Sequence, residues 1–266
     1  MKKTVLVTGA TGGIGVELCK EFAKDNYDIV IVGRTNDKIN YLIRILEQYP
    51  IQIYILKYDL RQNDVHHDIL KEIKELKIQI DILINMAGFG IYDEFLNHNL
   101  EDQNNLILVN LNSLMNLCYI IGKEMKERNS GYIINFSSIS AFFPGTYMAT
   151  YYASKAFILS FSLALARELK PYNIAVLGIC PGVIQTSFYD TAGADKSHSY
   201  LLDRMKPITA QKFAKLAYKQ IKKRKCNYCI IGFKNKFLIF LSRFIPIRFL
   251  SLIIKIVQKP KLKSES

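Results

Sequence analysis

The chain has 266 residues, half of them hydrophobic, and a formal net charge of +13. A chain of this length and composition forms one α/β domain with a sizeable core, which excludes an intrinsically disordered protein and a small disulfide-stabilised scaffold. The positive charge is confined to one end, because residues 1–189 carry a net charge of −1 and residues 190–266 a net charge of +14.

Short apolar runs typical of strands alternate with longer amphipathic segments typical of helices. The expected strands are Thr4–Thr8, Asp28–Val32, Gln52–Lys57, Ile80–Ile84, Tyr132–Ser137, Ile174–Ile179 and Tyr228–Ile231. The expected helices are Gly13–Lys24, Asp37–Gln48, Asn63–Lys77, Leu100–Glu127, Tyr151–Lys170 and Thr209–Lys223. Continuous apolar strands separated by helices indicate a parallel sheet with both faces covered. The sequence therefore predicts one doubly wound, Rossmann-type α/β domain over residues 1–232, with a mostly parallel seven-stranded sheet, and a C-terminal extension over residues 233–266.

A glycine-rich turn, Thr8-Gly9-Ala10-Thr11-Gly12-Gly13-Ile14-Gly15, joins the first strand to the first helix. Glycines there permit a tight turn and let the backbone approach a pyrophosphate, which binds at the positive N-terminus of the helix. The turn therefore predicts a dinucleotide site at the carboxyl ends of the strands, with cofactor contacts from Gly9, Thr11, Gly13, Ile14 and Gly15.

Arg34 stands at the end of the second strand, nineteen residues after Gly15. An acidic residue at this place would accept the adenosine ribose 2′-hydroxyl, whereas a guanidinium favours a 2′-phosphate. Arg34 therefore predicts NADP(H) in preference to NAD(H). Asp37 is close by, and we interpret it as part of the helix start.

Further motifs follow in chain order: Asn85-Met86-Ala87-Gly88, Asn110, Ser137-Ser138, Tyr151-Tyr152-Ala153-Ser154-Lys155, and Pro181-Gly182 with Thr186. Together with T-G-x-x-x-G-x-G at Thr8–Gly15, this series resembles the short-chain dehydrogenase/reductase family in its roughly 250-residue form. The match extends from the first residues to about Gly232, and it departs from the family pattern at Met86, where the family has a second asparagine.

The resemblance implies a catalytic set of Ser138, Tyr151, Lys155 and Asn110. In this set Ser138 would hydrogen-bond the substrate oxygen, and Asn110 would help to hold a water behind Lys155. The resemblance also implies that Asp59 contacts the adenine, that Asn85 steadies the central strand, and that Thr186 contacts the carboxamide. The full set of implied cofactor contacts beyond the turn and Arg34 is Asp59, Asn85, Ala87, Gly88, Tyr151, Lys155, Pro181, Gly182, Ile184 and Thr186.

Tyr151 and Lys155 are four residues apart, so they share one helix face. A free phenol has a pKa near 10, and a nearby ammonium lowers it toward the range that an acid/base needs. We therefore expect Lys155 to lower the pKa of Tyr151. The family spacing places the catalytic serine thirteen residues before the tyrosine, which selects Tyr151 and leaves Tyr152 as packing or pocket wall.

The segment between Ser187 and Pro207 is where the family usually closes over its substrate. It contains Phe188, Tyr189, Tyr200, Leu201, Leu202 and Met205, and Phe142, Phe143 and Tyr147 could add to the same pocket. This composition favours a lipophilic substrate.

The C-terminal extension contains two apolar and basic segments, Lys236–Ile245 and Ile247–Lys259, separated by Pro246. In the second segment Arg248, Ser251, Lys255 and Gln258 recur at helical spacing and form a narrow polar stripe. A basic amphipathic helix with a wide apolar face is typical of a membrane interface. Two alternatives remain open: the extension folds over the substrate cleft, or it pairs with another subunit.

The start of the chain favours a cytoplasmic protein, because the apolar run after Met1-Lys2-Lys3 is too short for a signal peptide. Five scattered cysteines argue against a disulfide framework. We interpret the lone C-x-x-C of Cys226 and Cys229 as part of a last buried strand. The four histidines show no ligand spacing, so no metal site is predicted.

The expected function is hydride transfer between NADP(H) and a carbonyl or secondary alcohol, on a lipophilic ketone of steroid-like or acyl-chain type. Alternatives are a 3-oxoacyl-carrier reductase, a non-catalytic NADP-binding protein and a nucleic-acid-binding protein. Nucleic acid is not an expected partner, because the cations are interleaved with apolar residues. A homo-oligomer is expected through the helices that carry Asn110 and Tyr151, and the location is cytoplasmic or peripheral on the inner face of a membrane.

Overall fold

The computed structural model describes residues 2–193, 207–224 and 226–259. Seven strands form one parallel sheet in the order β3-β2-β1-β4-β5-β6-β9. This confirms the predicted doubly wound fold, and each predicted strand lies within two residues of the observed one. The strands are β1 (Thr4–Thr8), β2 (Asp28–Gly33), β3 (Ile53–Lys57), β4 (Ile82–Asn85), β5 (Gly131–Phe136), β6 (Ile174–Cys180) and β9 (Tyr228–Ile230).

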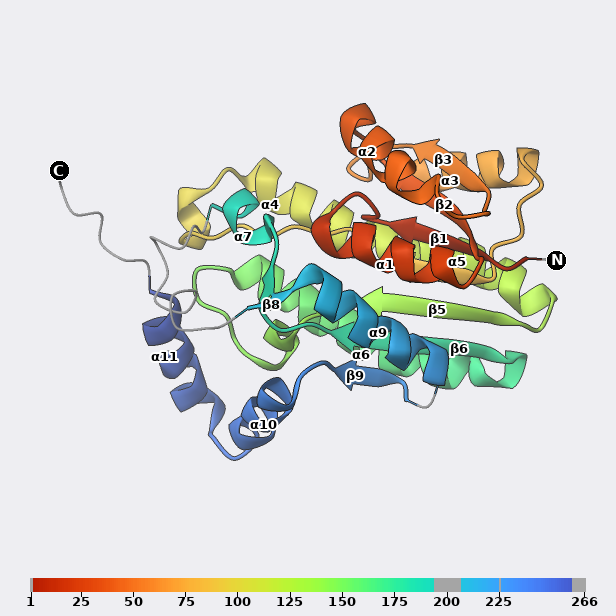
Figure 1. Ribbon diagram of the computed structural model, residues 1–266. Helices are drawn as coiled ribbons and strands as arrows, with labels where there is room; N and C mark the ends of the chain where they lie inside the picture. The colour runs from red at the N-terminus through yellow and green to blue at the C-terminus, as the bar shows by residue number, and fades with distance from the viewer. Residues whose placement is uncertain (1, 194–206, 225, 260–266) are drawn as a thin grey trace.

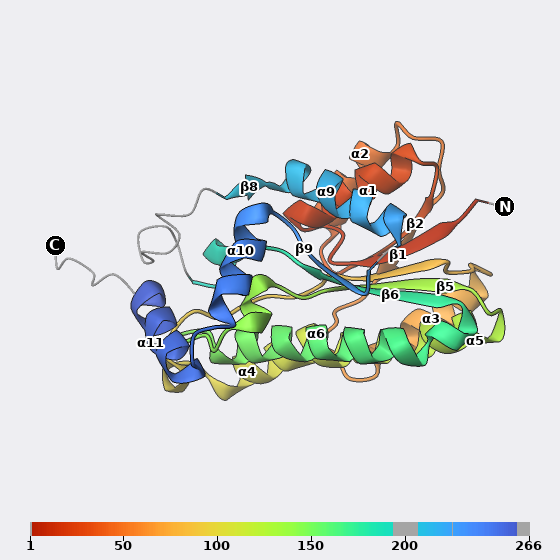
Figure 2. The ribbon, with the colours of Figure 1, turned by 90° about the horizontal axis from the view of Figure 1, so that it is seen from below.

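Helices cover both faces of the sheet, as Figure 2 shows. One face carries α1 (Gly13–Lys24), α2 (Asn36–Leu46) and α9 (Ala210–Lys223), and the other carries α3 (Val65–Glu75), α5 (Ser113–Glu127) and α6 (Ala149–Glu168). Successive residues of a strand point to opposite faces, so Val5 and Val7 of β1 pack under the first set while Leu6 packs under the second. Both faces are therefore buried, which explains the nearly continuous apolar character of the strands.

The expected helix over residues 100–127 is built from three parts, α4 (Leu100–Ile107), a π-helical turn η2 (Leu108–Asn112) and α5. By length and composition alone this stretch could cross a membrane. However, Leu114, Leu117 and Ile121 are buried against the sheet, which identifies it as a core helix. The π turn was not foreseen, because a single widened turn leaves the surrounding apolar period almost unchanged.

The order of the strands reverses between β1 and β4, and such a switch point opens a crevice at the carboxyl ends of the strands. Shorter elements surround these ends: η1 (Phe95–Asn97), η3 (Ile139–Phe142) and α7 (Phe188–Thr191), together with a two-stranded parallel ladder of β7 (Ile184–Gln185) and β8 (Ile208–Thr209). A further 3-10 turn, η4 (Lys170–Tyr172), precedes β6. The predicted pocket residues Tyr200, Leu201, Leu202 and Met205 lie outside the described residues.

Two helices end the described chain, α10 (Phe233–Ser242) and α11 (Ile247–Gln258), and Pro246 precedes the second. Figure 1 shows α11 beyond the carboxyl ends of the strands, next to α10. The last strand was predicted to be buried, but β9 is an edge strand that is only half buried, and Cys226 just before it is exposed. The division of the chain at Gly232 stays a prediction.

Leu117→Ala tests whether the helix of residues 100–127 is a core helix. Leu117 is fully buried, so we expect the free energy of unfolding to fall by about 2–5 kcal/mol. Met115→Ala on the same helix is the control, because Met115 is exposed and its loss costs less than about 1 kcal/mol. Urea denaturation measures both, and equal losses would contradict the packing of this helix on the sheet.

Candidate active site

A cavity of about 440 Å³ lies at the carboxyl ends of the central strands. Its walls come from the ends of β4 and β5, the start of α6, residues 181–188, and both C-terminal helices. Of the predicted site residues, the cavity brings together Ile14, Gly88, Ser138, Tyr151, Lys155, Pro181, Gly182, Ile184 and Thr186. The lining is predominantly apolar and includes a few polar groups, which is the usual character of a small-molecule site.

Tyr151 lies in the first turn of α6, and its ring packs against Phe188 with 5.3 Å between the ring centroids. Burial raises the pKa of Tyr151 to about 12, while the neighbouring side chains of Ser138 and Ser140 act in the opposite direction. The two serines therefore stabilise the phenolate only in part. In this environment the hydroxyl stays protonated around neutral pH and can act as a proton donor.

Lys155 lies one helical turn after Tyr151 and is buried. Its Nζ donates a hydrogen bond to the backbone oxygen of Phe136 at 3.0 Å and stands 5.6 Å from the centroid of the Tyr151 ring. Burial lowers the pKa of Lys155 to about 8. The net shift of the pKa of Tyr151 is upward, opposite to the lowering expected from the nearby ammonium. The reason is desolvation, which favours the neutral form of both side chains.

Asn110 lies in the π turn, and its side chain is fully buried. Its Oδ1 accepts a hydrogen bond from the backbone N–H of Phe89, and its Nδ2 donates to the backbone oxygen of Phe89 and to Ser154 Oγ. Ser154 Oγ in turn donates to the backbone oxygen of Tyr151 at 2.7 Å. Asn110 therefore fixes the loop after β4 to the first turns of α6. The predicted water behind Lys155 stays a prediction.

Gly88 lies between Asn110 and Lys155. A Cβ atom at residue 88 would stand 3.0 Å from Asn110 Oδ1 and 3.5 Å from Lys155 Nζ. A side chain at residue 88 would therefore crowd the ammonium of Lys155, and glycine is the residue that lets the backbone approach it closely.

The two serines after β5 have different roles. Ser138, the predicted catalytic serine, lines the cavity, and its Oγ accepts the backbone N–H of Ser140 at 3.1 Å. Ser137 Oγ donates to the backbone oxygen of Lys155 at 2.7 Å and so joins β5 to α6. This second role was not predicted, because adjacent serines at a strand end carry no signal that distinguishes their directions.

The glycine turn packs directly on the loop after β4. Gly9 has a φ of +70°, and a Cβ there would lie 2.8 Å from the backbone nitrogen of Ala87. A Cβ at Gly15 would lie 2.3 Å from the backbone oxygen of Gly9. Thr8 Oγ1 accepts the backbone N–H groups of Met86 and Ala87, which holds the two loops together.

The N-terminus of α1 points its backbone N–H groups toward the same crevice. No side chain caps this helix, and its first turn has no acidic residue. A Cβ at Gly13 would stand 3.0 Å from Thr186 Cγ2, so the predicted carboxamide contact lies beside the turn. The uncapped, positive N-terminus of α1, next to the backbone of a turn with few side chains, suits the binding of a pyrophosphate.

Arg34 and Asp59 lie outside the cavity, beyond the glycine turn. Arg34 follows β2 with 62% of its side chain exposed, and its Nη1 stands 3.8 Å from Asp59 Oδ2. Asp59 also forms an ion pair with Arg61, which lowers the pKa of the carboxyl group. Arg61 was not predicted, although it provides a second guanidinium on this side. Thr11 joins the same region, since its Cγ2 would lie 3.6 Å from a Cβ at Gly33.

Asn85 lies at the end of β4, in register with Asn135 of β5. Its Nδ2 donates to Asn135 Oδ1 at 2.9 Å and to Cys118 Sγ at 3.2 Å, and Asn135 Nδ2 donates to Ser162 Oγ at 3.0 Å. This buried series joins β4, β5 and α6, so the side chain of Asn85 positions the strands and does not line the cavity. Asn135 could have been suspected as an asparagine within an apolar strand.

The C-terminal extension forms one wall of the cavity. The backbone oxygen of Gln258 accepts a hydrogen bond from the Tyr92 hydroxyl, and Gln258 Nε2 donates to the Tyr152 hydroxyl. Gln258 shares the helical spacing of Arg248 but is buried at the end of α11, whereas Arg248 is exposed. Among the arrangements left open by the sequence, the extension covers the cleft.

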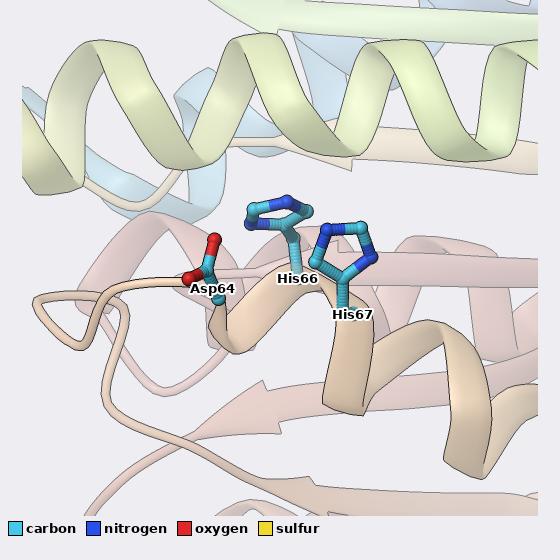
Figure 3. A group of neighbouring side chains, drawn as sticks. All are labelled: Asp64, His66 and His67. Carbon is cyan, nitrogen blue, oxygen red and sulfur yellow. The ribbon is translucent and has the colours of Figure 1, made fainter.

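Asp64, His66 and His67 gather at the first turn of α3, as Figure 3 shows. One ligand atom from each lies within 4.8 Å of the others, a proximity that spacing alone did not indicate. However, His66 Nδ1 already contacts Asn116 Nδ2 at 3.1 Å, and the positive helix N-terminus opposes a cation. The group lies away from the cavity, and we assign it no role in the reaction.

Comparison with known proteins agrees with this geometry. The profile of the family described as short chain dehydrogenase matches residues 3–197. An uncharacterized oxidoreductase of Staphylococcus epidermidis is 30% identical over 194 residues, which are 73% of this chain and 82% of that protein. A very-long-chain 3-oxoacyl-CoA reductase-A of Danio rerio is 31% identical over 69% of this chain and 59% of that protein. A solved short-chain dehydrogenase of Sphingobium yanoikuyae in complex with NADPH is 26% identical, with a TM-score of 0.80 over 91% of this chain and 93% of that one.

Lys155→Met tests the burial of the ammonium. Since the pKa of Lys155 falls from its ordinary 10.5 to about 8 on folding, the unfolded chain binds an extra proton between these values. This one group therefore contributes a rise of about 3 kcal/mol to the free energy of unfolding across this window. Burial raises the pKa of Cys19, Cys118, Cys180 and Cys229, which contribute in the opposite sense in both proteins, so the difference between wild type and variant isolates Lys155. We expect the free energy of unfolding of the wild type minus that of Lys155→Met to rise by about 3 kcal/mol across the window, as measured by urea denaturation at several pH values. The exposed Lys170→Met is the control, and its difference from the wild type should stay constant, while a constant difference for Lys155→Met would contradict the desolvation.

Proposed function

The chain belongs to the short-chain dehydrogenase family of oxidoreductases, and we propose that it transfers hydride between NADP(H) and a carbonyl or secondary alcohol. The observation that carries this proposal is that Ser138, Tyr151 and Lys155 line one predominantly apolar cavity.

The roles of the residues follow from their surroundings. When bound, NADPH would be the source of the hydride that reaches the carbonyl carbon. Tyr151 donates its phenolic proton to the carbonyl oxygen, which becomes the hydroxyl of the product, and Ser138 hydrogen-bonds the same oxygen. In the reverse direction the phenolate takes the proton back.

NADP(H) rather than NAD(H) is supported by the residues after β2 and β3. Arg34 is largely exposed and stands near Arg61, so two guanidinium groups flank the place where a 2′-phosphate would bind. The structurally similar Sphingobium yanoikuyae enzyme is a complex with NADPH. We propose that Gly9, Thr11, Gly13, Ile14 and Gly15 hold the pyrophosphate side of the cofactor.

The remaining cofactor contacts proposed here lie around the nicotinamide and the adenine. Asp59 lies on the adenine side, where its ion pairs with Arg34 and Arg61 position it. The others surround the cavity or its rim: Ala87, Gly88, Tyr151, Lys155, Pro181, Gly182, Ile184 and Thr186.

A lipophilic substrate is supported by the composition of the cavity wall. The residues of the domain that line the cavity include Tyr92, Phe143, Met148 and Phe188. The lining residues of the extension are all aliphatic except Ser242 and Gln258. An acyl-chain ketone suits this lining, and one relative is named as a very-long-chain 3-oxoacyl-CoA reductase. A 3-oxoacyl-carrier reductase is therefore the second candidate.

The proposal extends to assembly and location. The outer side of α4–α6 exposes Ile107, Met115, Tyr119 and Phe157, which would suit a homo-oligomer through these helices. We propose a cytoplasmic protein that works at the surface of a membrane, because its extension is basic and apolar.

Tyr151→Phe and Tyr152→Phe form a matched pair that tests the chemistry. Tyr151→Phe removes the proton donor, so kcat/KM for NADPH-dependent ketone reduction should fall by about 10²–10⁴-fold. Tyr152→Phe should lose less than about tenfold, because its hydroxyl contacts Gln258 rather than Ser138. NADPH oxidation over a panel of steroid ketones, acyl ketones, aldehydes and sugars measures both effects and the substrate class. Equal losses would show that the wrong tyrosine is assigned, and turnover confined to sugars would overturn the lipophilic substrate.

Arg34→Ser tests the choice of cofactor. Loss of a guanidinium–phosphate contact should weaken NADPH binding by about 10–100-fold and leave NADH binding unchanged. Titration of the nicotinamide fluorescence of each cofactor measures this. Lys71→Ser, which removes an exposed cation from α3, should change neither affinity. An equal loss for NADPH and NADH would contradict recognition of the 2′-phosphate by Arg34.

A further inference from the structure

The helix α10 carries an exposed stripe of phenylalanines. Phe233, Phe237, Phe240 and Phe244 recur at intervals of four, three and four residues through this helix and just past its end. Their exposed fractions are 83%, 54%, 54% and 72%, and none of them lines the cavity. Four neighbouring exposed aromatic rings are a large apolar surface for a protein in water.

The helix α11 continues this surface. Ile247, Phe249, Leu252 and Ile256 are exposed and are absent from the cavity wall. We call these four residues and the four phenylalanines of the preceding stripe the outer face. The opposite sides of the same helices line the cavity, through Leu241, Ile245, Leu250, Ile254 and Val257 among others.

The charge around the outer face has one sign. Residues 233–259 contain six basic residues and no acidic residue, and all six are exposed: Lys234, Lys236, Arg243, Arg248, Lys255 and Lys259. Basic side chains around an apolar surface match the headgroups and the acyl boundary of an anionic bilayer. A second copy of the same face is a poor partner, because a symmetric pairing would bring the six cations of one chain against the six of the other.

The cavity reaches the surface at the outer face. Leu238, Leu241 and Ile253 line the cavity and are also 48%, 44% and 43% exposed, so they form a rim between the two surfaces. In Figure 2, α10 and α11 lie together at the end of the molecule where the strands have their carboxyl ends.

We propose that the outer face of α10 and α11 docks on an anionic lipid bilayer and places the mouth of the cavity at the lipid. A lipophilic substrate then passes from the bilayer over Leu238 and Ile253 to Tyr151 without crossing water. The docking follows from the outer face alone, whereas the delivery of substrate rests on the proposed function.

Vesicle flotation of the full chain tests the docking, because aggregated protein sinks while lipid-bound protein floats. The probes are vesicles of phosphatidylcholine alone and of an equimolar mixture with phosphatidylglycerol. We expect flotation with the mixture only. Phe237→Ser/Phe240→Ser/Phe244→Ser should lower the bound fraction at least tenfold, and Arg243→Gln/Arg248→Gln/Lys255→Gln should lower the partition coefficient about a hundredfold, since each well-placed cation contributes about fivefold.

Two matched controls separate the outer face from general surface properties. Leu76→Ser/Leu96→Ser/Leu100→Ser removes three exposed apolar side chains from other parts of the surface. Lys212→Gln/Lys215→Gln/Lys219→Gln removes three exposed lysines from α9, so its net charge equals that of the basic outer-face variant. Both controls should float like the wild type.

Three results would overturn the docking: a wild type that stays with the soluble fraction, equal flotation with neutral vesicles, or equal losses in outer-face and control variants. Turnover separates the two proposals. The phenylalanine variant should reduce a short water-soluble ketone at the wild-type rate but a long-chain ketone dissolved in vesicles at least tenfold more slowly. Flotation without any ketone reduction would overturn the proposed function and leave the docking standing. If the phenylalanine variant and the wild type reduced the vesicle substrate at equal rates, delivery from the lipid would be overturned.

Discussion

The site depends on how the buried ammonium of Lys155 is held. Its hydrogen bond to the backbone oxygen of Phe136 requires the last residue of β5 to end directly beneath α6. Ser137 strengthens this junction, because its hydroxyl binds the backbone oxygen of Lys155 itself. On the other side, Gly88 keeps the loop after β4 free of a side chain that would crowd the ammonium. The position of one cation therefore constrains a strand end, a helix and a loop.

The C-terminal wall and the acid/base pair border the same cavity. Gln258 joins α11 to Tyr92 and Tyr152, and Tyr151 and Lys155 line the cavity that this wall helps to enclose. Burial raises the pKa of the phenol and lowers that of the ammonium, so both are driven toward neutrality. A positively charged oxidised nicotinamide would favour the phenolate again. The charge state of the pair would therefore depend on what is bound beside it.

Local patterns in the sequence predicted the fold and the polar end of the site, because strand period, turn chemistry and the spacing of Tyr151 and Lys155 are local properties. Features that depend on distant contacts were missed. Gln258 has the same helical spacing as Arg248 and Lys255, so only its partner 106 residues away distinguishes it. The pKa of Tyr151 was predicted in the wrong direction, because a nearby lysine is visible in the sequence but the burial of the phenol is not. Asn110 was predicted from the sequence, but the π turn that contains it was not.

The pattern of apolar and polar residues in α11 indicates that three different environments surround this helix. Leu250, Ile254 and Val257 face the cavity, Phe249, Leu252 and Ile256 face outward, and Arg248, Ser251 and Lys255 form a narrow polar stripe. A helix that only covered a cleft in a water-soluble enzyme would need one apolar face and a broad polar one. Exposing the second apolar face to water is unfavourable by about 25 cal/mol for each square ångström. The second face is therefore best explained by a partner that is itself apolar, and the exposed cations beside it favour one that carries negative charge at its surface.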